Sequence, residues 1–206
     1  MVFIIKLADR HLGRLICNFL GLFRGKKDRI SHDEIGKILV IQLWGIGETI
    51  LTLPSIEALR KTFPNAKIDV LATSRNKDVF FGNKNINHAF SLNLSPFSIL
   101  KFLIKHFRSY DLVIDMEEYL NISAIMSFFA GKKSVGYSHN SRAKLYTEKV
   151  KYNDKQHAVQ TFLDLARKLN THYNANNLPR LEFSKRDKNA VDKFLERSAI
   201  KKGDFF

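Results

Sequence analysis

The chain has 206 residues, of which 45% are hydrophobic, and its formal net charge is +14. This length and apolar content suit one ordinary domain with a full core. The single cysteine, Cys17, excludes an intrachain disulfide framework, and seven scattered histidines without a second cysteine argue against a structural metal site. The positive charge predicts an anionic partner, which could be nucleic acid, a phosphorylated glycolipid or membrane headgroups.

The first thirty residues predict an amphipathic helix with a basic face. Helical spacing places a set of apolar residues on one side of the helix: Ile5, Leu12, Ile16, Phe19 and Phe23. It places the basic residues Lys6, Arg10 and Arg14 on the other side. The longest charge-free stretch, 15–23, is about half of the ~20 residues that a membrane span needs. We therefore expect residues 1–30 to lie in the plane of a membrane surface, with four cations at the headgroups: Arg24, Lys26, Lys27 and Arg29. The alternative is a helix packed against its own domain.

Beyond Gly36, short apolar runs alternate with helical periods, which is typical of βαβ units. We expect strands over Lys37–Leu43, Lys67–Ala72, His88–Leu92, Leu112–Asp115 and Ser134–Tyr137. Helices are expected over Glu48–Phe63, Asn76–Phe81, Pro96–Phe107, Tyr119–Ala130 and Lys155–Asn170. The pattern predicts an α/β fold, a doubly wound parallel sheet of Rossmann-like type over residues 36–175. Residues 176–206 then form a connector with a charged helix, Lys185–Arg197.

The most informative stretch is Lys37–Arg60, KILVIQLWGIGETILTLPSIEALR, where a buried strand ends in a glycine-rich turn and becomes a helix. Gly45 and Gly47 allow a tight turn, and Glu48 falls in the first helical turn, where unpaired N–H groups favour negative charge. The carboxyl end of such a strand is a usual place for a ligand site.

NAD binding and ATP hydrolysis are disfavoured at this turn, because neither of the two usual nucleotide-binding motifs is complete. A dinucleotide fingerprint needs a third glycine at the position where this chain has Ile50. A Walker P-loop needs a lysine directly after its last glycine, and no lysine follows Gly45 or Gly47. What remains is a small backbone nest with one carboxylate at its edge, suited to binding a polar substrate and taking a proton from it. The alternative is that Glu48 only complements the helix dipole.

Three segments together resemble the amino-terminal half of the lipopolysaccharide heptosyltransferases, glycosyltransferase family 9. They are KILVIQLWGIGETILTLPSIEALRKTFPNAKIDVL, DLVIDMEEYLNISAIMSFFAGKKSVGY and HAVQTFLDLARKL, and the leading KLADRHLGRLICNFL is similar to a leader seen in many members. The resemblance implies a GT-B architecture, whose first Rossmann-like domain binds the sugar acceptor and whose second binds the nucleotide-sugar donor, usually ADP-heptose. It also implies an inverting reaction without metal or cofactor.

The resemblance assigns roles to the turn and to the fourth strand. Members carry Asp where this chain has Glu48, which makes Glu48 the candidate general base, with Gly45, Ile46 and Gly47 as acceptor contacts. After the fourth strand this chain has the pair Glu117-Glu118, where family members more often have a Gln-Gly type pair. This change could alter acceptor choice, and it makes Asp115 or Glu117 a fallback base; Asp115 could instead cap the following helix.

Further acceptor contacts are expected after the fifth strand. Residues 131–186 contain twelve Lys or Arg and four Asp or Glu, which predicts a basic acceptor wall around Lys132, Lys133, Arg142 and Lys144. Phosphates and Kdo carboxylates of a lipopolysaccharide core would fit that wall. Tyr137 and His157 complete the predicted set, although a histidine that opens a helix is more often a cap or a packing residue.

The sequence thus predicts a fragment of a glycosyltransferase that acts on a glycolipid at the cytoplasmic face of the inner membrane. Alone it should be inactive, because the donor domain is missing. The alternatives are a non-catalytic protein that binds anionic ligands or a membrane surface, and, less favoured, a nucleic-acid-binding module. Nucleic acid is disfavoured because the aromatic residues are mostly Phe in apolar runs rather than interleaved with basic residues.

Overall fold

The computed structural model describes residues 9–25, 30–171, 173 and 179–198. In this part of the chain, six strands form one sheet in the order β3-β2-β1-β4-β5-β6. They are β1 Lys37–Ile41, β2 Lys67–Ala72, β3 His88–Ser91, β4 Tyr110–Asp115, β5 Gly131–Tyr137 and β6 Glu148–Val150. Every neighbouring pair is parallel, so the predicted doubly wound, Rossmann-like sheet is confirmed, with β6 as an added edge strand.

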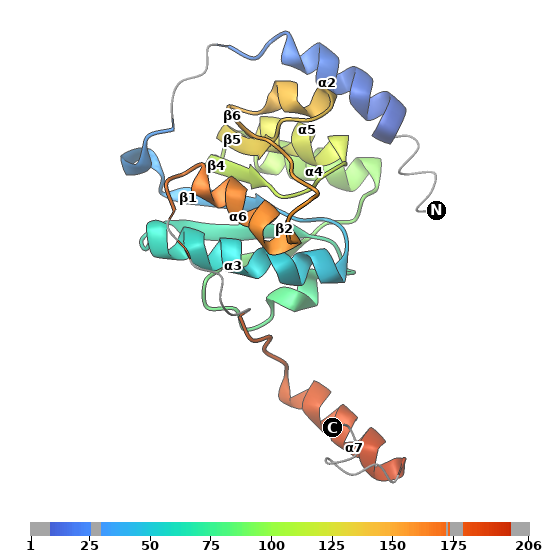
Figure 1. The fold of residues 1–206 in the computed structure, drawn as a ribbon. Coiled ribbons are helices and arrows are strands. Elements are labelled where there is room, and N and C mark those ends of the chain that lie inside the picture. The colour runs from blue at the N-terminus through green and yellow to red at the C-terminus, as the bar shows by residue number, and fades with distance from the viewer. Residues whose placement is uncertain (1–8, 26–29, 172, 174–178, 199–206) are drawn as a thin grey trace.

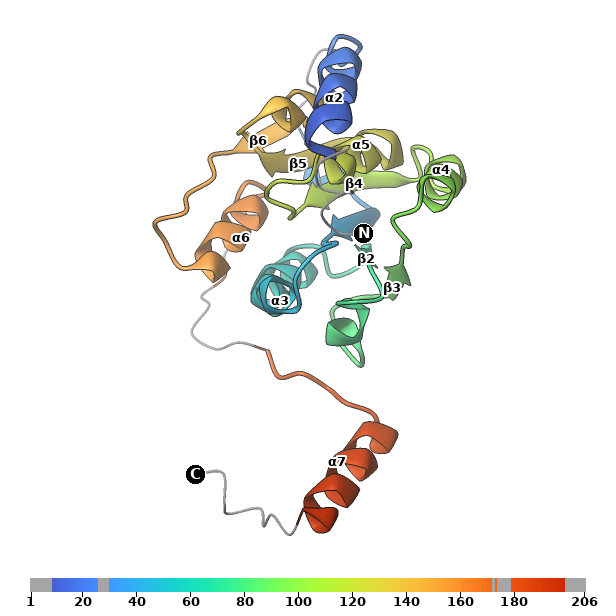
Figure 2. The same cartoon turned by 90° about the vertical axis from the view of Figure 1, so that its right-hand side faces the viewer.

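Helices cover both faces of this sheet. The α-helices are α2 Arg14–Gly21, α3 Ile46–Thr62, α4 Pro96–Lys105, α5 Asn121–Ala130, α6 Ala158–Arg167 and α7 Lys185–Arg197. Shorter helical turns are η1 Asp9–Gly13, η2 His32–Glu34, η3 Lys77–Phe80 and η4 Ser141–Leu145. Figure 1 and Figure 2 show α3 and α6 on one face and α4 and α5 on the other, with α2 lying outside α5.

Strand β1 is buried on both faces, as its aliphatic sequence requires. Ile38 and Val40 belong to the apolar cluster under α3 and α6, whereas Leu39 and Ile41 belong to the cluster under α4 and α5. All four are fully buried, which is the pattern of a central strand in a parallel sheet.

The topology places a crevice beside β1. The chain runs from β1 outward to β2 and β3, and then returns to β4 on the other side of β1. In a doubly wound sheet this switch point opens a crevice at the carboxyl ends of the two strands, where ligands usually bind. Both the Gly45–Glu48 turn after β1 and the Glu117-Glu118 pair after β4 follow these ends.

The described part of the N-terminal helix packs against its own domain. Cys17 is fully buried, in a cluster with residues of α5 and η4. The Asp9 carboxylate accepts hydrogen bonds from the backbone N–H groups of Asn121 at 2.8 Å and of Ile122 at 2.7 Å, and so caps α5. The backbones also approach closely, because a Cβ added to Gly13 would lie 2.8 Å from the Asn121 Cβ. The alternative of a packed helix is therefore the one that the structure shows.

The predicted apolar stripe of this helix is consequently divided. Ile16 packs on the domain, whereas Leu12, Phe19 and Phe23 of the same stripe remain exposed. Leu15 and Leu22, which the predicted stripe does not include, are exposed as well. Five residues of the predicted membrane helix and its basic end lie outside the described residues: Ile5, Lys6, Lys26, Lys27 and Arg29.

Helix α7 confirms the predicted charged helix, with the same bounds. Ser184 and Asp187 form a capping box at its start, and none of its residues is buried. In both views the helix stands away from the sheet and its covering helices (Figure 1, Figure 2). It therefore contributes nothing to the crevice beside β1.

Candidate active site

The β1–α3 turn is built around Gly45. Its φ of +75° is a conformation that side chains rarely adopt, and a Cβ added there would lie 1.7 Å from Glu48 Oε2. The Glu48 carboxylate thus folds back over the turn, into space that only a glycine leaves free. The Thr49 hydroxyl fixes the start of the helix by donating to the Gly45 carbonyl at 2.5 Å.

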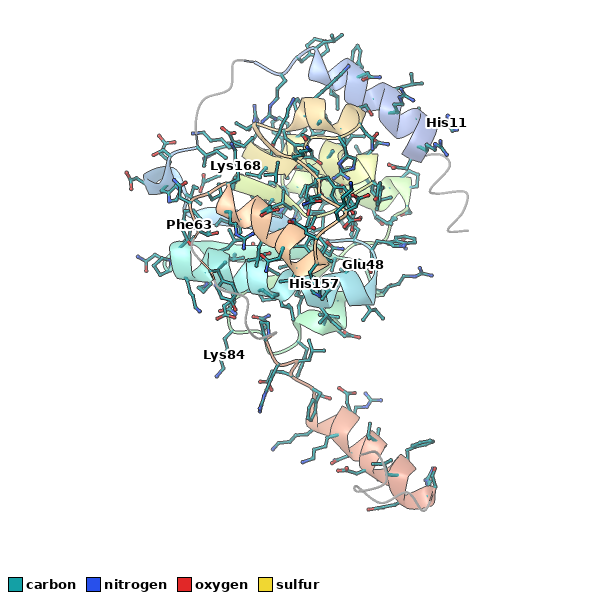
Figure 3. The ribbon with its side chains drawn as sticks, viewed as in Figure 1. His11, Glu48, Phe63, Lys84, His157 and Lys168 are labelled. Atoms are coloured by element: carbon teal, nitrogen blue, oxygen red, sulfur yellow. The ribbon has the colours of Figure 1, made fainter. Side chains whose placement is uncertain are left out.

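A cleft of about 1020 Å³ opens at this turn. One side follows the carboxyl ends of β1 and β4 and includes Gln42, Trp44, Glu48, Met116, Glu117, Glu118, Tyr119 and Leu120. The other side comes from the N-terminal helix and from the starts of α5 and η4, and includes Asp9, Arg10, Arg14, Asn18, Asn121, Asn140, Ser141 and Lys144; Phe162 of α6 completes the lining. Figure 3 shows Glu48, at the start of α3, on the same side of the molecule as His157.

Glu117 positions the turn rather than offering a free carboxylate. Its Oε1 accepts hydrogen bonds from the backbone N–H groups of Leu43 at 2.5 Å and of Trp44 at 2.8 Å. Burial, with the negative charge of Asp115 in addition, raises the pKa of the Glu117 carboxyl to about 8. Glu117 therefore ties the end of β1 to the end of β4 beneath the cleft.

Asp115 is fully buried and lies outside the cleft lining. Its Oδ2 accepts hydrogen bonds from Ser123 Oγ at 2.8 Å, Tyr146 Oη at 2.6 Å and Arg142 Nη2 at 2.9 Å. Burial raises the pKa of this carboxyl, and the Arg142 charge opposes that shift. Asp115 thus joins β4 to η4, so it is out of reach of a ligand in the cleft. It is not the backbone cap of α5 either, because Asp9 holds that place.

Glu118 is a cleft residue that sequence reasoning considered only as part of the Glu117-Glu118 pair and did not name as a base or a contact. It is half-buried and lines the cleft with Glu48. Burial raises the pKa of the Glu118 carboxyl, its hydrogen bond with Tyr152 opposes that shift, and the negative charge of Glu48 adds to it. The Glu48 charge therefore acts on Glu118 on this side of the cleft. The available signal was the adjacent Glu-Glu pair directly after β4.

The predicted lysine contacts at the start of β5 are wrong. Lys132 Nζ pairs with Asp111 at 2.8 Å, and Lys133 Nζ pairs with Glu34 at 3.2 Å. Both residues stand at the amino end of β5, whereas the cleft lies at the carboxyl ends of the parallel strands. Arg142 is fully buried against Asp115. Of the four predicted wall cations, only Lys144 lines the cleft.

The last two predicted contacts have structural roles. Tyr137 is fully buried and its hydroxyl donates to the Thr161 carbonyl at 3.2 Å. His157 caps α6, because its Nδ1 accepts from the backbone N–H of Val159 at 3.3 Å. Neither residue belongs to the cleft lining, so for His157 the cap alternative is confirmed.

The raised pKa of Glu117 predicts a pH-dependent stability. Its ordinary pKa is 4.5, so between about pH 4.5 and pH 8 the folded chain retains a proton that the unfolded chain has lost. The free energy of unfolding should therefore fall as the pH rises through this window. Glu117→Gln should flatten the slope, which urea unfolding of both forms at several pH values would measure. Equal slopes in both forms would show that Glu117 does not titrate in this window.

Residues 103–203, just under half of the chain, match the family model of glycosyltransferase family 9 (heptosyltransferase). The resemblance to family 9 is confirmed. Comparison with curated protein sequences gives no match.

Solved structures of family 9 proteins share the fold. A glycosyl transferase family 9 protein from Veillonella parvula DSM 2008 is similar over 84% of this chain and 52% of its own, with a TM-score of 0.72 and 18% identity. Escherichia coli heptosyltransferase WaaC with ADP-2-deoxy-2-fluoro heptose is similar over 69% of this chain and 51% of its own (TM-score 0.59, 17% identity). E. coli ADP-heptose lps heptosyltransferase II is similar over 81% of this chain and 51% of its own (TM-score 0.59, 20% identity). The chain thus spans about half the length of these structures, which fits the amino-terminal half of a GT-B protein.

Proposed function

We propose that this chain is the acceptor-binding half of a family 9 glycosyltransferase, which transfers a heptose or a related sugar from an ADP-sugar to a lipopolysaccharide core or similar glycolipid. The observation that carries the proposal is the Glu48 carboxylate, held in the glycine turn at the mouth of the cleft. It stands at the carboxyl end of the central strand, where the fold offers a site, and in the position of the family's proposed base.

Glu48 would act as the general base of a single displacement. It would take the proton from the acceptor hydroxyl as that oxygen attacks the anomeric carbon, while the nucleoside diphosphate leaves from the opposite face. One displacement inverts the anomeric centre through an oxocarbenium-like transition state. The donor phosphates would be bound by the second domain, and the family resemblance implies that no metal takes part.

The extra methylene of glutamate is compatible with this role. A displacement of ~1 Å can reduce a rate by ~10²-fold, so a longer side chain could misplace the base. In this chain the Glu48 side chain folds back over Gly45 instead of reaching straight into the cleft. Folding back shortens its reach, which supports a carboxylate position nearer to that of an aspartate.

The test is a completed protein, in which this chain is followed by the donor-binding half of a family 9 enzyme. We expect transfer from ADP-heptose to a Kdo-containing lipid A acceptor, seen as a mass increase of one heptose, and no transfer by the 206-residue chain alone. Absence of transfer by a folded completed protein, with several ADP-sugars and acceptors, would contradict the proposal and favour a non-catalytic binding protein.

We also propose that the protein works as a peripheral protein on a membrane surface, because two helices expose apolar side chains next to basic ones. On η1, α2 and the end of α2 they are Leu12, Leu15, Phe19, Leu22 and Phe23. On α4 and its end they are Phe97, Leu100, Ile104 and Phe107. Lys101 and Lys105 accompany the second group. Among the described helices none is long and apolar enough to cross a bilayer, so binding in the membrane plane is the mode that these faces support.

The two apolar faces are connected through the end of α5. Phe107 contacts Phe129 with ring centroids 6.3 Å apart, Phe129 contacts Phe128 at 5.3 Å, and the Arg24 guanidinium lies 5.5 Å from the Phe128 ring centroid. This line of contacts joins the end of α4 to the end of α2. Arg24 itself is partly buried and donates hydrogen bonds to Ser134 Oγ at 3.3 Å and to Thr147 Oγ1. The cations of this face that can meet anionic headgroups are therefore the exposed Lys101 and Lys105.

Substituting Phe19→Ser and Phe23→Ser should weaken binding to phosphatidylglycerol vesicles about tenfold or more, since each inserted Phe contributes on the order of 1 kcal/mol or more. Co-sedimentation at low and high salt would measure it, and binding should weaken with salt. The matched control is Phe194→Ser, an equally exposed Phe on α7. Equal sedimentation of all three forms would contradict the membrane role. Deleting residues 1–30 is a poorer test, because it also removes the Asp9 cap of α5.

A further inference from the structure

We infer that the N-terminal helix is part of the acceptor site: Arg10, Arg14 and Lys144 bind an acidic group of the acceptor, a phosphate or a sugar carboxylate, opposite the Glu48 side of the cleft. This inference rests on the proposed function and assigns, in the same site, the residues that hold the acidic group of the acceptor.

The first observation is that these three cations line the cleft and form no ion pair with any acidic residue in the part of the chain that the structure describes. Arg10 and Arg14 come from η1 and α2, and Lys144 comes from η4. Lys132 and Arg142, by contrast, are each paired with an aspartate. The cleft therefore presents three cations whose charge is available to a ligand.

The second observation is that the cations are carried on a firmly attached helix. Asp9, next to Arg10, is held by two backbone N–H groups of α5. The Gly13 backbone, next to Arg14, is pressed against Asn121. At the other end of the helix a Cβ added to Gly21 would lie 2.8 Å from the Lys144 Cβ, so α2 and η4 are also in close contact. A wall fixed in this way loses little freedom on binding a ligand.

The third observation is strain in the same wall. Asn140 lines the cleft with φ +61° and ψ −177°, a region that residues other than glycine rarely occupy. Its neighbour Ser141 donates a hydrogen bond to Asn121 Oδ1 at 3.4 Å. Backbone strain of this kind concentrates at ligand sites, and here it presents an amide and a hydroxyl beside the three cations.

The β1–β4 side of the cleft carries the carboxylates of Glu48 and Glu118. The other side carries three cations and the Asp9 carboxylate, which backbone N–H groups of α5 already hold, so its net charge is positive. This difference in charge selects the ligand. Glu48 and Glu118 would repel an acid that approached the β1–β4 side, whereas Arg10, Arg14 and Lys144 attract it to the other. A sugar with an acidic group at one end and a free hydroxyl at the other would satisfy both sides. The charge pattern would then orient the acceptor with its reactive hydroxyl toward Glu48.

Trp44 provides the readout, because it is the single tryptophan of the sequence and lines the cleft. We expect Kdo and glucose 6-phosphate to change its fluorescence saturably and more tightly than neutral glucose. Arg10→Gln with Arg14→Gln should raise the Kd of both acids about tenfold, which corresponds to ~1.4 kcal/mol. Lys101→Gln with Lys105→Gln, which removes the same charge from α4, should leave the Kd unchanged. Circular dichroism would verify that each variant is folded.

The inference is overturned if neither acid binds more tightly than glucose, or if the α4 control weakens binding as much as the cleft variant. It is also overturned if the Arg10 and Arg14 substitutions reduce binding to phosphatidylglycerol vesicles but not to the soluble acids, because the cations would then belong to a membrane surface. The inference and the proposed function can fail separately. If the completed protein transfers no sugar but acid binding still depends on Arg10 and Arg14, the proposed function is wrong and the inference about the cations stands. If transfer depends on Glu48 but acid binding does not change when Arg10 and Arg14 are substituted, the proposed function stands and the inference is wrong.

Discussion

Glu48→Gln in the completed protein is expected to lower kcat by about 10²–10⁴-fold, the usual contribution of a positioned acid–base group. Glutamine preserves the shape of the side chain and cannot take a proton at neutral pH. The residue is exposed at the mouth of the cleft, so the fold and acceptor binding should change little. Steady-state kinetics at saturating acceptor, with release of ADP as the readout, would measure the effect.

Two further substitutions define what the result means. Glu48→Asp should be tolerated and could be faster, because it restores the residue that the family carries. Glu118→Gln removes the other carboxylate on this side of the cleft, on which the Glu48 charge acts, and should cost less than Glu48→Gln. An unchanged kcat in Glu48→Gln would move the base to Glu118, since Asp115 is buried away from the cleft and Glu117 clamps the turn. Loss of folding in place of rate would favour the helix-dipole role.

Arg142→Met is expected to lower the free energy of unfolding by about 3–5 kcal/mol, the range for breaking a buried ion pair from one side. Arg142 and Asp115 are both fully buried, and the substitution would leave the Asp115 carboxylate without its cation. The expected loss is large because Arg142 Nη2 also donates to the Tyr146 hydroxyl at 2.7 Å. Urea unfolding followed by circular dichroism would measure it, and the variant could fail to fold at all.

Arg167→Met is the matched control. Arg167 pairs with Asp164 at 2.7 Å, but both side chains are substantially exposed, so this substitution should cost less than about 1 kcal/mol. Asp115→Asn combined with Arg142→Met should cost less than Arg142→Met alone, because the uncompensated charge is removed. If Arg142→Met and Arg167→Met proved equally mild, the buried pair would not hold η4 to β4.

The central part of the fold could be predicted because its signals are local. The run Ile38–Ile41 is apolar at every position, and this pattern is typical of a strand that is covered on both faces. The turn that follows also shows itself locally, since Gly45 and Glu48 are three residues apart and the glycine is needed by the carboxylate that folds over it. The short edge strand β6, Glu148–Val150, has no comparable apolar run.

The basic wall was misplaced because charge alone does not say where a side chain pairs. Arg142 resembles a solvent-exposed cation in sequence, and charged residues are almost never fully buried unless paired; its partner Asp115 lies 27 positions away. Lys132 and Lys133 are the second and third residues of β5, so their distance from the cleft follows from strand direction and not from composition.

The N-terminal helix shows the limit of a helical wheel. Helical spacing finds an apolar side, but it cannot say that Ile16 would pack on the domain while Phe19 and Phe23 stay exposed. The cap that attaches this helix joins Asp9 to Asn121, which are 112 positions apart. Only tertiary structure brings Arg10 and Arg14 to the cleft, and for that reason they were assigned to a membrane surface alone.

The claim that this cleft is the acceptor site can be tested most directly on the 206-residue chain itself. Because Trp44 is the single tryptophan, a ¹H–¹⁵N spectrum contains one indole N–H signal, and that signal reports on the cleft lining. Titration with a deacylated, water-soluble Kdo-containing acceptor should shift this indole signal saturably. The same titration of the Glu48→Gln variant should shift it in the same way, because acceptor binding should change little. An indole signal that stays in place while the acceptor shifts backbone signals elsewhere in the chain would contradict the account.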